Sequence, residues 1–249
     1  MTSIDVEAQW EAPISEHEAT RYVVTTIEHL TATIAEVWLR PLAAPMTYSP
    51  GAYVLLEDLV GHFQPRAYSI ANAPREDGLI SLLITRVPGG HTSGWVHQRL
   101  AAGDEVLVTG PYGTFVADPS SSAPRLHLAA GSGLGPIRAL IEAALEGPPR
   151  QSLTLIVSAR TEAEVMDRER FGRWQDIHPQ FHFVRTLTRD IGPDPHGRIP
   201  TLLPRLCPDL DGHEVFVAGA RGFVRACSWA AQALGASPEC IHTESFSFL

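Results

Sequence analysis

The fold of the second half is decided by the stretch Leu126-His-Leu-Ala-Ala-Gly131-Ser-Gly133-Leu-Gly135-Pro136. It predicts a buried strand, a glycine turn and a helix with proline in its first turn. Glycines let a backbone approach a pyrophosphate closely, and the free N–H groups at a helix start favour its negative charge. Tight turns also use glycines for packing alone, and Pro136 replaces the third glycine of the dinucleotide fingerprint, so both interpretations stay open.

Strands and helices alternate on the C-terminal side of this stretch. We predict strands at 126–130, 153–158, 181–187 and 215–218, and helices at 136–145, 162–174 and 221–234. This alternation is typical of an α/β doubly wound parallel sheet. No acidic residue directly follows the second strand, where a ribose hydroxyl would be held; Ser158-Ala-Arg160 stands there instead.

The N-terminal half has a different pattern of predicted secondary structure. Short β-rich segments lie at 22–29, 34–41, 52–56, 67–70, 79–87 and 105–108, with one helix at 93–100. This spacing predicts an antiparallel β-barrel or sandwich. We therefore expect an acidic leader over 1–19, a barrel domain over 20–118, a linker over 119–124 and the α/β domain over 125–249.

Two candidate anion sites lie in the first half. Arg66 and Tyr68 share one face of a predicted strand, where a guanidinium can hold a phosphate and the ring offers a stacking surface. Downstream, Gly89-Gly90-His-Thr92-Ser93 leads into the predicted helix, and we expect Thr92 or Ser93 to cap it. Two anion sites beside an aromatic ring, joined to a nucleotide-type α/β half, indicate two nucleotide ligands that meet at the domain boundary.

Composition excludes several classes of function. The formal net charge of −9 disfavours binding to nucleic acid, and all 19 basic residues are Arg, which excludes Schiff-base lysines and the P-loop lysine. The three cysteines cannot supply the four thiolates of an iron–sulfur cluster. The chain shows no signal sequence, membrane-spanning run or metal-ligand spacing. We expect a cytoplasmic monomer with reduced thiols, no metal and no membrane insertion.

Five motifs occur in order along the chain: Arg66-x-Tyr68-Ser69, Gly89-Gly90-x-x-Ser93, Gly110-Pro-x-Gly113-x-Phe115, Gly131-x-Gly133-x-x-Pro136 and Val215-Phe-Val-Ala-Gly219. Together they resemble the ferredoxin–NADP⁺ reductase superfamily over about residues 21–249. The chain is most similar to the reductases of bacterial oxygenases, which end in a Thr-Glu-aromatic tail like Thr243-Glu244-Ser-Phe246. The resemblance implies FAD and either NADH or NADPH as cofactors.

The resemblance also implies a role for each motif. Arg66 and the turn Gly90–Ser93 would hold the FAD pyrophosphate, Tyr68 would stack on the isoalloxazine, and Ser69 would hydrogen-bond near N5. Gly131–Pro136 would hold the pyridine-nucleotide pyrophosphate. Phe246, with Phe248 as the lesser alternative, would cover the flavin. The expected catalytic residues are Ser69, Glu244 and Phe246, and the expected cofactor-binding residues are Arg66, Ala67, Tyr68, Ser69, Ile84, Arg86, Gly90, Thr92, Ser93, Gly131, Gly133, Leu134, Gly135, Pro136, Arg160, Arg189, Gly219, Ala220 and Phe246.

The implied activity is that of an FAD-dependent NAD(P)H oxidoreductase. A hydride would pass from the nicotinamide to flavin N5, and electrons would leave singly for a separate ferredoxin or oxygenase component. Two alternatives stay open: a free-flavin reductase, and a regulatory or electron-conduit subunit without its own NAD(P)H turnover. Arg160 or Arg189 could hold a 2′-phosphate, but Ala159-Arg-Thr161 also resembles NADH-using relatives, so the choice of nucleotide stays open.

Two departures from the family pattern concern function. Ala218 stands where many relatives have a cysteine close to the hydride path, which puts the efficiency of hydride transfer in doubt. The chain also has neither the length nor the cysteines for the iron–sulfur module that many oxygenase reductases carry. Other conspicuous residues are expected to be structural: His127 and Cys227 as buried packing, and Arg168, Arg170 and Arg173 as a solvated helix face.

Overall fold

The computed structural model describes residues 18–190 and 195–246. In the first half, six strands form a sheet in the order β4-β3-β6-β1-β2-β5, with every pairing antiparallel. A bridge between Ile70 and Leu82 joins its two edges, so the sheet closes into a barrel around a buried aliphatic core. The strands are β1 (Thr20–His29), β2 (Ile34–Pro41), β3 (Tyr53–Asp58), β4 (Arg66–Ser69), β5 (Ile80–Thr85) and β6 (Glu105–Tyr112), with helix α1 (His91–Gln98) between β5 and β6.

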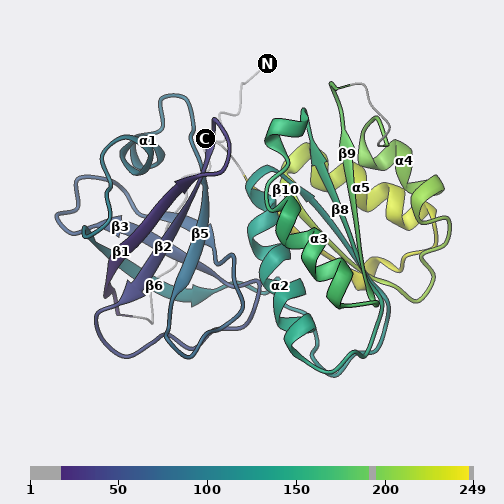
Figure 1. Ribbon diagram of the computed structural model, residues 1–249, viewed down its shortest axis with the longest axis horizontal. Coiled ribbons are helices and arrows are strands. Elements are labelled where there is room, and N and C mark those ends of the chain that lie inside the picture. Colours follow the sequence, from purple (N-terminus) through teal and green to yellow (C-terminus); the bar gives the residue numbers. More distant parts are fainter. Residues whose placement is uncertain (1–17, 191–194, 247–249) are drawn as a thin grey trace, which may run out of the picture.

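The second half is a five-stranded parallel sheet in the order β11-β10-β7-β8-β9. Helices α2 and α3 cover one face and α4 and α5 the other (Figure 1). The strands are β7 (Arg125–Ala130), β8 (Leu153–Ala159), β9 (Phe181–Leu187), β10 (Glu214–Ala220) and β11 (Ile241–Phe246). The helices are α2 (Leu134–Glu146), α3 (Arg168–Ile177), α4 (Ile199–Leu206) and α5 (Arg221–Ala233). The predicted fold class, an antiparallel barrel followed by a doubly wound parallel sheet, is confirmed.

Three elements differ from the sequence prediction. The helix expected over 162–174 is a short 3-10 turn (Glu162–Glu164) followed by α3, because Asp167 adopts a left-handed conformation (φ +54°) that no α-helix contains. Helix α4 and strand β11 were not expected at all. Of the predicted leader, residues 1–17 lie outside the described residues, as does Phe248.

One buried arginine joins the two halves. Arg138 on α2 is fully buried and donates to the carbonyl of Ala71 (2.6 Å), to Ser81 Oγ (2.9 Å) and to the Glu36 carboxylate, all in the barrel half. Its remaining nitrogen donates to Asp167 of the α/β half (2.7 Å). A guanidinium with this many charged and polar partners holds α2 against the barrel in one orientation.

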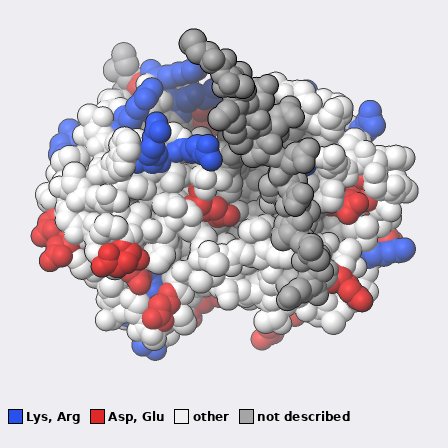
Figure 2. All heavy atoms as spheres, turned by 180° about the vertical axis from the view of Figure 1, so that it is seen from behind, with Lys and Arg blue, Asp and Glu red and all other residues white. Residues whose placement is uncertain are grey.

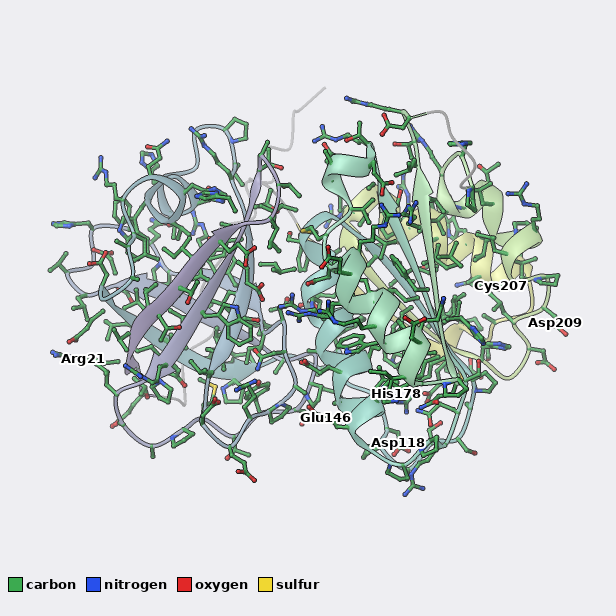
Figure 3. All side chains as sticks on the ribbon, viewed as in Figure 1. Arg21, Asp118, Glu146, His178, Cys207 and Asp209 are labelled. Atoms are coloured by element: carbon green, nitrogen blue, oxygen red, sulfur yellow. The ribbon has the colours of Figure 1, made fainter. Side chains whose placement is uncertain are left out.

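The direction of the strands places the nucleotide turn. In Figure 3, Glu146 at the end of α2 and Asp118 before β7 both lie at the lower end of the molecule. The carboxyl end of β7 and the start of α2 therefore lie at the upper end, which is where open parallel sheets bind ligands. Among the described residues, no helix is both long enough and apolar enough to cross a membrane.

Candidate functional site

A hydrogen bond between the two halves marks the centre of the site. Ser69 at the end of β4 donates to Glu244 Oε1 of β11 at 2.8 Å, across 175 residues of sequence. Ser69 reaches this position because β4 ends at the closing bridge of the barrel, and Glu244 because β11 extends the parallel sheet beside β10. The structure thus brings together two of the three expected catalytic residues.

Glu244 is held in an environment that favours its neutral form. Burial raises the pKa of its carboxyl to about 7, against the smaller lowering effect of the Ser69 hydrogen bond. Its second oxygen, Oε2, is buried and has no hydrogen-bond partner among the described residues. An unpartnered buried oxygen at a domain boundary fits a site where a polar ligand completes the contacts.

Arg66 and Tyr68 lie two residues apart on β4 and therefore on the same face of the strand, as predicted. The Arg66 guanidinium is exposed and donates to Gln64 Oε1 (3.4 Å) and to the carbonyl of Pro65 (3.2 Å). Among the described residues, no carboxylate forms an ion pair with it. Tyr68 is half-buried, and burial raises the pKa of its phenol to about 12. An available guanidinium beside a neutral aromatic ring suits a phosphate joined to a flat ring system.

The start of α1 corrects one prediction. The N-cap residue is Gly90, and neither Thr92 nor Ser93 caps the helix with its side chain. Thr92 instead donates to the carbonyl of Gln64 (2.9 Å), and Ser93 Oγ accepts from the Val87 amide (3.1 Å). The first bond ties the helix start to the segment before β4, and the second lies within the turn. Because both hydroxyls are used in this way, the first N–H groups of the helix have no side-chain cap and are available to an anion.

A hollow lies beside this turn. It has a volume of about 300 Å³ and is lined by residues that include Phe63, Arg86, Gly89, Gly90, His91 and Trp95. Phe63 and Trp95 stack at its side, with ring centroids 5.4 Å apart. Of the other expected cofactor-binding residues, Ala67 is exposed on β4. Ile84 is fully buried, and its carbonyl lies 2.9 Å from His97 Nε2.

The glycines of the turn after β7 do not all have the same role: one is open to a ligand, and the others are needed for packing. Gly131 has φ +58°, and nothing lies within 4 Å of where a Cβ would be, so it offers open backbone to a ligand. A Cβ on Gly133 would meet the carbonyl oxygen of Ala218 at 2.2 Å, and one on Gly135 would meet Ala71 at 3.3 Å. Gly133 and Gly135 therefore serve packing, while Leu134 and Pro136 are buried in α2.

The end of β10 meets the C-terminal strand. Ala220 pairs with Phe246 and Ala218 with Glu244 in the parallel register of β10 and β11. Gly219 adopts φ +154°, and a Cβ there would meet the ring of Phe223 at 2.9 Å. Phe246 is half-buried at the end of β11, two residues beyond Glu244, so the aromatic tail lies next to the Ser69–Glu244 contact.

The end of β8 holds a residue that the sequence did not reveal. Arg160 follows β8 as expected, but its guanidinium is bound by Glu164, with contacts of 2.5 and 2.9 Å. No acidic residue follows β8 directly, in agreement with the sequence, but the 3-10 turn over Glu162–Glu164 brings the Glu164 carboxylate back to Arg160 at the strand end. Arg189 lies beside Arg160 through a backbone hydrogen bond of 2.9 Å.

The residues that we expected to have structural roles lie in structural surroundings. His127 is buried against the ring of Phe216 (centroids 5.4 Å apart), and burial lowers the pKa of its imidazole to about 3, so it is uncharged. Cys227 is fully buried, and the α3 arginines pair with nearby carboxylates. Within residues 18–190 and 195–246, no group of three or more potential ligands could hold a metal ion.

Charge also favours phosphates at the ligand-binding end of the sheet. In the rear view, basic side chains gather at the upper end of the α/β half, although the chain is acidic overall (Figure 2). The carboxyl ends of the strands lie at this same end (Figure 3). Positive charge at this end of the sheet favours binding of the phosphates of a dinucleotide.

Comparisons with known proteins agree with this geometry. The chain matches the oxidoreductase FAD-binding domain over residues 24–116 and the oxidoreductase NAD-binding domain over residues 128–228. It is 34% identical over 239 residues to the reductase subunit of an aromatic O-demethylase from Amycolatopsis, covering 90% of this chain and 71% of that one. It is 31% identical over 228 residues to the ferredoxin–NAD(P)⁺ reductase component of a naphthalene 1,2-dioxygenase/salicylate 5-hydroxylase system from Ralstonia, covering 90% and 67%.

Solved structures show the same fold. The crystal structure of a cytochrome P450 reductase from Amycolatopsis superposes with a TM-score of 0.86 at 31% identity, covering 92% of this chain and 70% of that one. The ferredoxin reductase of carbazole 1,9a-dioxygenase gives a TM-score of 0.82 at 26% identity, covering 94% and 71%. The chain thus spans about seven tenths of the length of these relatives.

Proposed function

This chain belongs to the ferredoxin reductase-like oxidoreductases, which combine an FAD-binding and an NAD-binding domain. We propose that it supplies a separate ferredoxin or oxygenase component with electrons from NAD(P)H. The protein is a flavin-dependent NAD(P)H reductase, and the relatives named above are reductase components of oxygenase systems. We propose its electron acceptor as a chemical class, a ferredoxin or an oxygenase component.

The residues present fit an FAD molecule at the domain boundary. The exposed Arg66 guanidinium and the uncapped start of α1 would hold its pyrophosphate, and Tyr68 would lie against its ring system. The open backbone at Gly131 would hold the pyrophosphate of NAD(P)H. Bound FAD supplies the redox chemistry, since it accepts a hydride from a nicotinamide and can release electrons one at a time.

The chain's own contribution is geometry and the position of one proton. Hydride transfer needs the donor and acceptor atoms at about 3–3.5 Å with water excluded. Ser69 and Glu244 join the two domains, and hydride transfer would take place beside this contact. The raised pKa of Glu244, about 7, lets its carboxyl take up or release a proton near neutral pH. Phe246 would exclude water from the ring face until the nicotinamide displaces it.

The Ser69–Glu244 hydrogen bond carries the proposal. It joins the last residue of β4 in the FAD-binding half to the last strand of the NAD-binding half, so ligands of the two domains would meet beside it. No feature of either domain alone requires this contact. We further propose a monomer that works in the cytoplasm, in support of which all three cysteines are free thiols.

A diaphorase assay tests the proposed function. The purified protein, loaded with FAD, should reduce an artificial one-electron acceptor with NADH or NADPH. If it binds FAD but oxidises neither nucleotide, the electron-conduit alternative takes its place. The free-flavin reductase alternative predicts instead that FAD leaves on gel filtration and that the rate rises with added free flavin.

A further inference from the structure

The structure contains a feature that would distinguish NADH from NADPH. This inference rests on the proposed function, because it concerns the nucleotide that the enzyme oxidises. The two nucleotides differ only in a 2′-phosphate on the adenosine ribose. In doubly wound sheets, the ribose of a dinucleotide lies at the carboxyl end of the strand beside the glycine turn. Here that strand is β8, which pairs in parallel register with β7 as far as Ala130 and Ser158.

Arg160 at this strand end is already occupied. Glu164 Oε1 lies 2.5 Å from one guanidinium nitrogen, and Glu164 Oε2 accepts from Nε at 2.9 Å and from the Arg160 amide at 3.1 Å. Two parallel contacts plus a backbone N–H fix the carboxylate in place. The Arg160 hydrogen bond lowers the pKa of Glu164, so the carboxylate is charged at neutral pH.

The surrounding backbone holds this pair rigidly. The Arg160 carbonyl accepts from the amides of Arg189 (2.9 Å) and Asp190 (3.3 Å), which follow β9. Asp190 Oδ2 in turn accepts from the Glu162 amide at 2.7 Å, which holds the 3-10 turn that carries Glu164. The acid and the arginine therefore belong to one connected unit at the strand end.

The chemistry of this unit differs for the two nucleotides. A ribose 2′-hydroxyl can donate to a carboxylate, and Glu164 has a remaining lone-pair position for it. A 2′-phosphate bound by Arg160 would need that guanidinium to leave Glu164, and a 2′-phosphate at this strand end would in any case lie beside the Glu164 carboxylate. Juxtaposed like charges cost several kcal/mol, whereas an exposed ion pair by itself is worth little.

We propose that Glu164 makes this enzyme selective for NADH by binding the 2′-hydroxyl side of the adenosine ribose and excluding a 2′-phosphate. Arg160 is the positioning residue that holds Glu164 in place. Without the Glu164 charge, the same arginine becomes a phosphate ligand.

Binding of NAD⁺ and NADP⁺, measured by calorimetry on the FAD-loaded protein, tests this proposal without requiring turnover. The wild type should bind NAD⁺ at least about tenfold more tightly than NADP⁺, and Glu164→Gln should reduce that ratio at least about tenfold, since each factor of ten corresponds to about 1.4 kcal/mol. The double variant Arg160→Ala/Glu164→Gln should lose the NADP⁺ affinity gained by Glu164→Gln. Glu162→Gln is the matched control, because Glu162 pairs with Arg168 and Arg185 instead; its ratio should match the wild type.

Two results overturn the inference: a wild type that binds NADP⁺ as tightly as NAD⁺, or a Glu164→Gln variant with an unchanged ratio. Both leave the proposed function standing, because binding and diaphorase activity still occur. If neither nucleotide binds, the proposed nucleotide site is wrong, and the inference falls together with the proposed function. Arg160 and Glu164 have substantial exposure, and the unfolding transition of each variant verifies that it is folded.

Discussion

At the scale of single residues, Arg66 gives the sharpest test of the flavin site. Its guanidinium is exposed and forms no ion pair with a described carboxylate, so Arg66→Ala should leave the fold unchanged. It should also lose most of the bound FAD, because a charge-assisted contact with the pyrophosphate disappears. The ratio of FAD to protein after gel filtration measures this. Arg40→Ala, another exposed arginine of the barrel, is the control, and stoichiometric FAD in the Arg66→Ala protein would refute the placement.

Glu244 predicts a pH dependence of stability. Its folded-state pKa of about 7 lies above the ordinary value of 4.5, so the folded protein holds a proton that the unfolded chain releases. The resulting stabilisation is complete below about pH 4.5 and is lost as pH rises through about 7. The melting temperature of the wild type should therefore fall relative to that of Glu244→Gln between about pH 5 and pH 8. A constant difference over this range would show that the carboxyl is not held neutral.

Residue-level prediction from sequence worked where one short motif contained the information. Arg66 and Tyr68 sit two residues apart on a strand, so alternation alone placed them on one face. Glu164 was missed because it reaches Arg160 through a 3-10 turn, which hydrophobic periodicity does not reveal. A signal was present in the i, i+4 spacing of Arg160 and Glu164, but an unbroken helix over 162–174 would not have contained Arg160.

At the scale of elements, β11 matters most for function and was the hardest to predict. Its residues Ile241–Phe246 are half-buried or exposed and lack a continuous apolar run. The strand forms because β10 offers a free edge with which it pairs over six residues. Helix α4 was missed for a different reason: Pro200 and Pro204 indicate a loop, although Ile199 and Leu203 pack into the core beneath it.

The position of β11 predicts that the aromatic tail acts as a gate. Phe246 pairs with Ala220, beside the expected nicotinamide site, and a flavin ring is the flat apolar surface that it would cover. Phe246→Ala should therefore change the apparent affinity for the nicotinamide nucleotide and shift the visible spectrum of bound FAD. Titration with the nucleotide followed by absorbance measures both. If only the melting temperature changes, the ring serves packing and does not gate the site.

At the scale of the whole molecule, Arg138 makes the two domains one unit. The guanidinium is fully buried and paired with Glu36 of the barrel and Asp167 of the α/β half. No sequence pattern could predict this contact, since Glu36 and Arg138 are 102 residues apart and each looks like an ordinary charged residue on its own element. The fold of each domain, in contrast, followed from local periodicity and turn residues.

Replacing Arg138 should destabilise both domains together. Arg138→Met leaves the buried Glu36 carboxylate without its ion-pair partner and leaves Asp167 with Arg170 alone. This costs about 3–5 kcal/mol and lowers the melting temperature by roughly 10 °C. Arg75→Met removes an exposed pair with Asp77 of comparable geometry and should change it by no more than about 2 °C. Thermal unfolding of the three proteins measures the contrast. Equal effects of the two substitutions would mean that Arg138 does not join the domains.

The central claim is that this protein moves a hydride from a pyridine nucleotide to a flavin held between its two domains. Anaerobic rapid mixing of the FAD-loaded protein with NADH or NADPH tests it most directly, with the visible absorbance of the flavin as the signal. We predict that one nucleotide bleaches this absorbance completely within a single turnover, and faster in the wild type than in Ser69→Ala, which cannot donate to Glu244. Flavin absorbance that stays unchanged with both nucleotides would contradict the account.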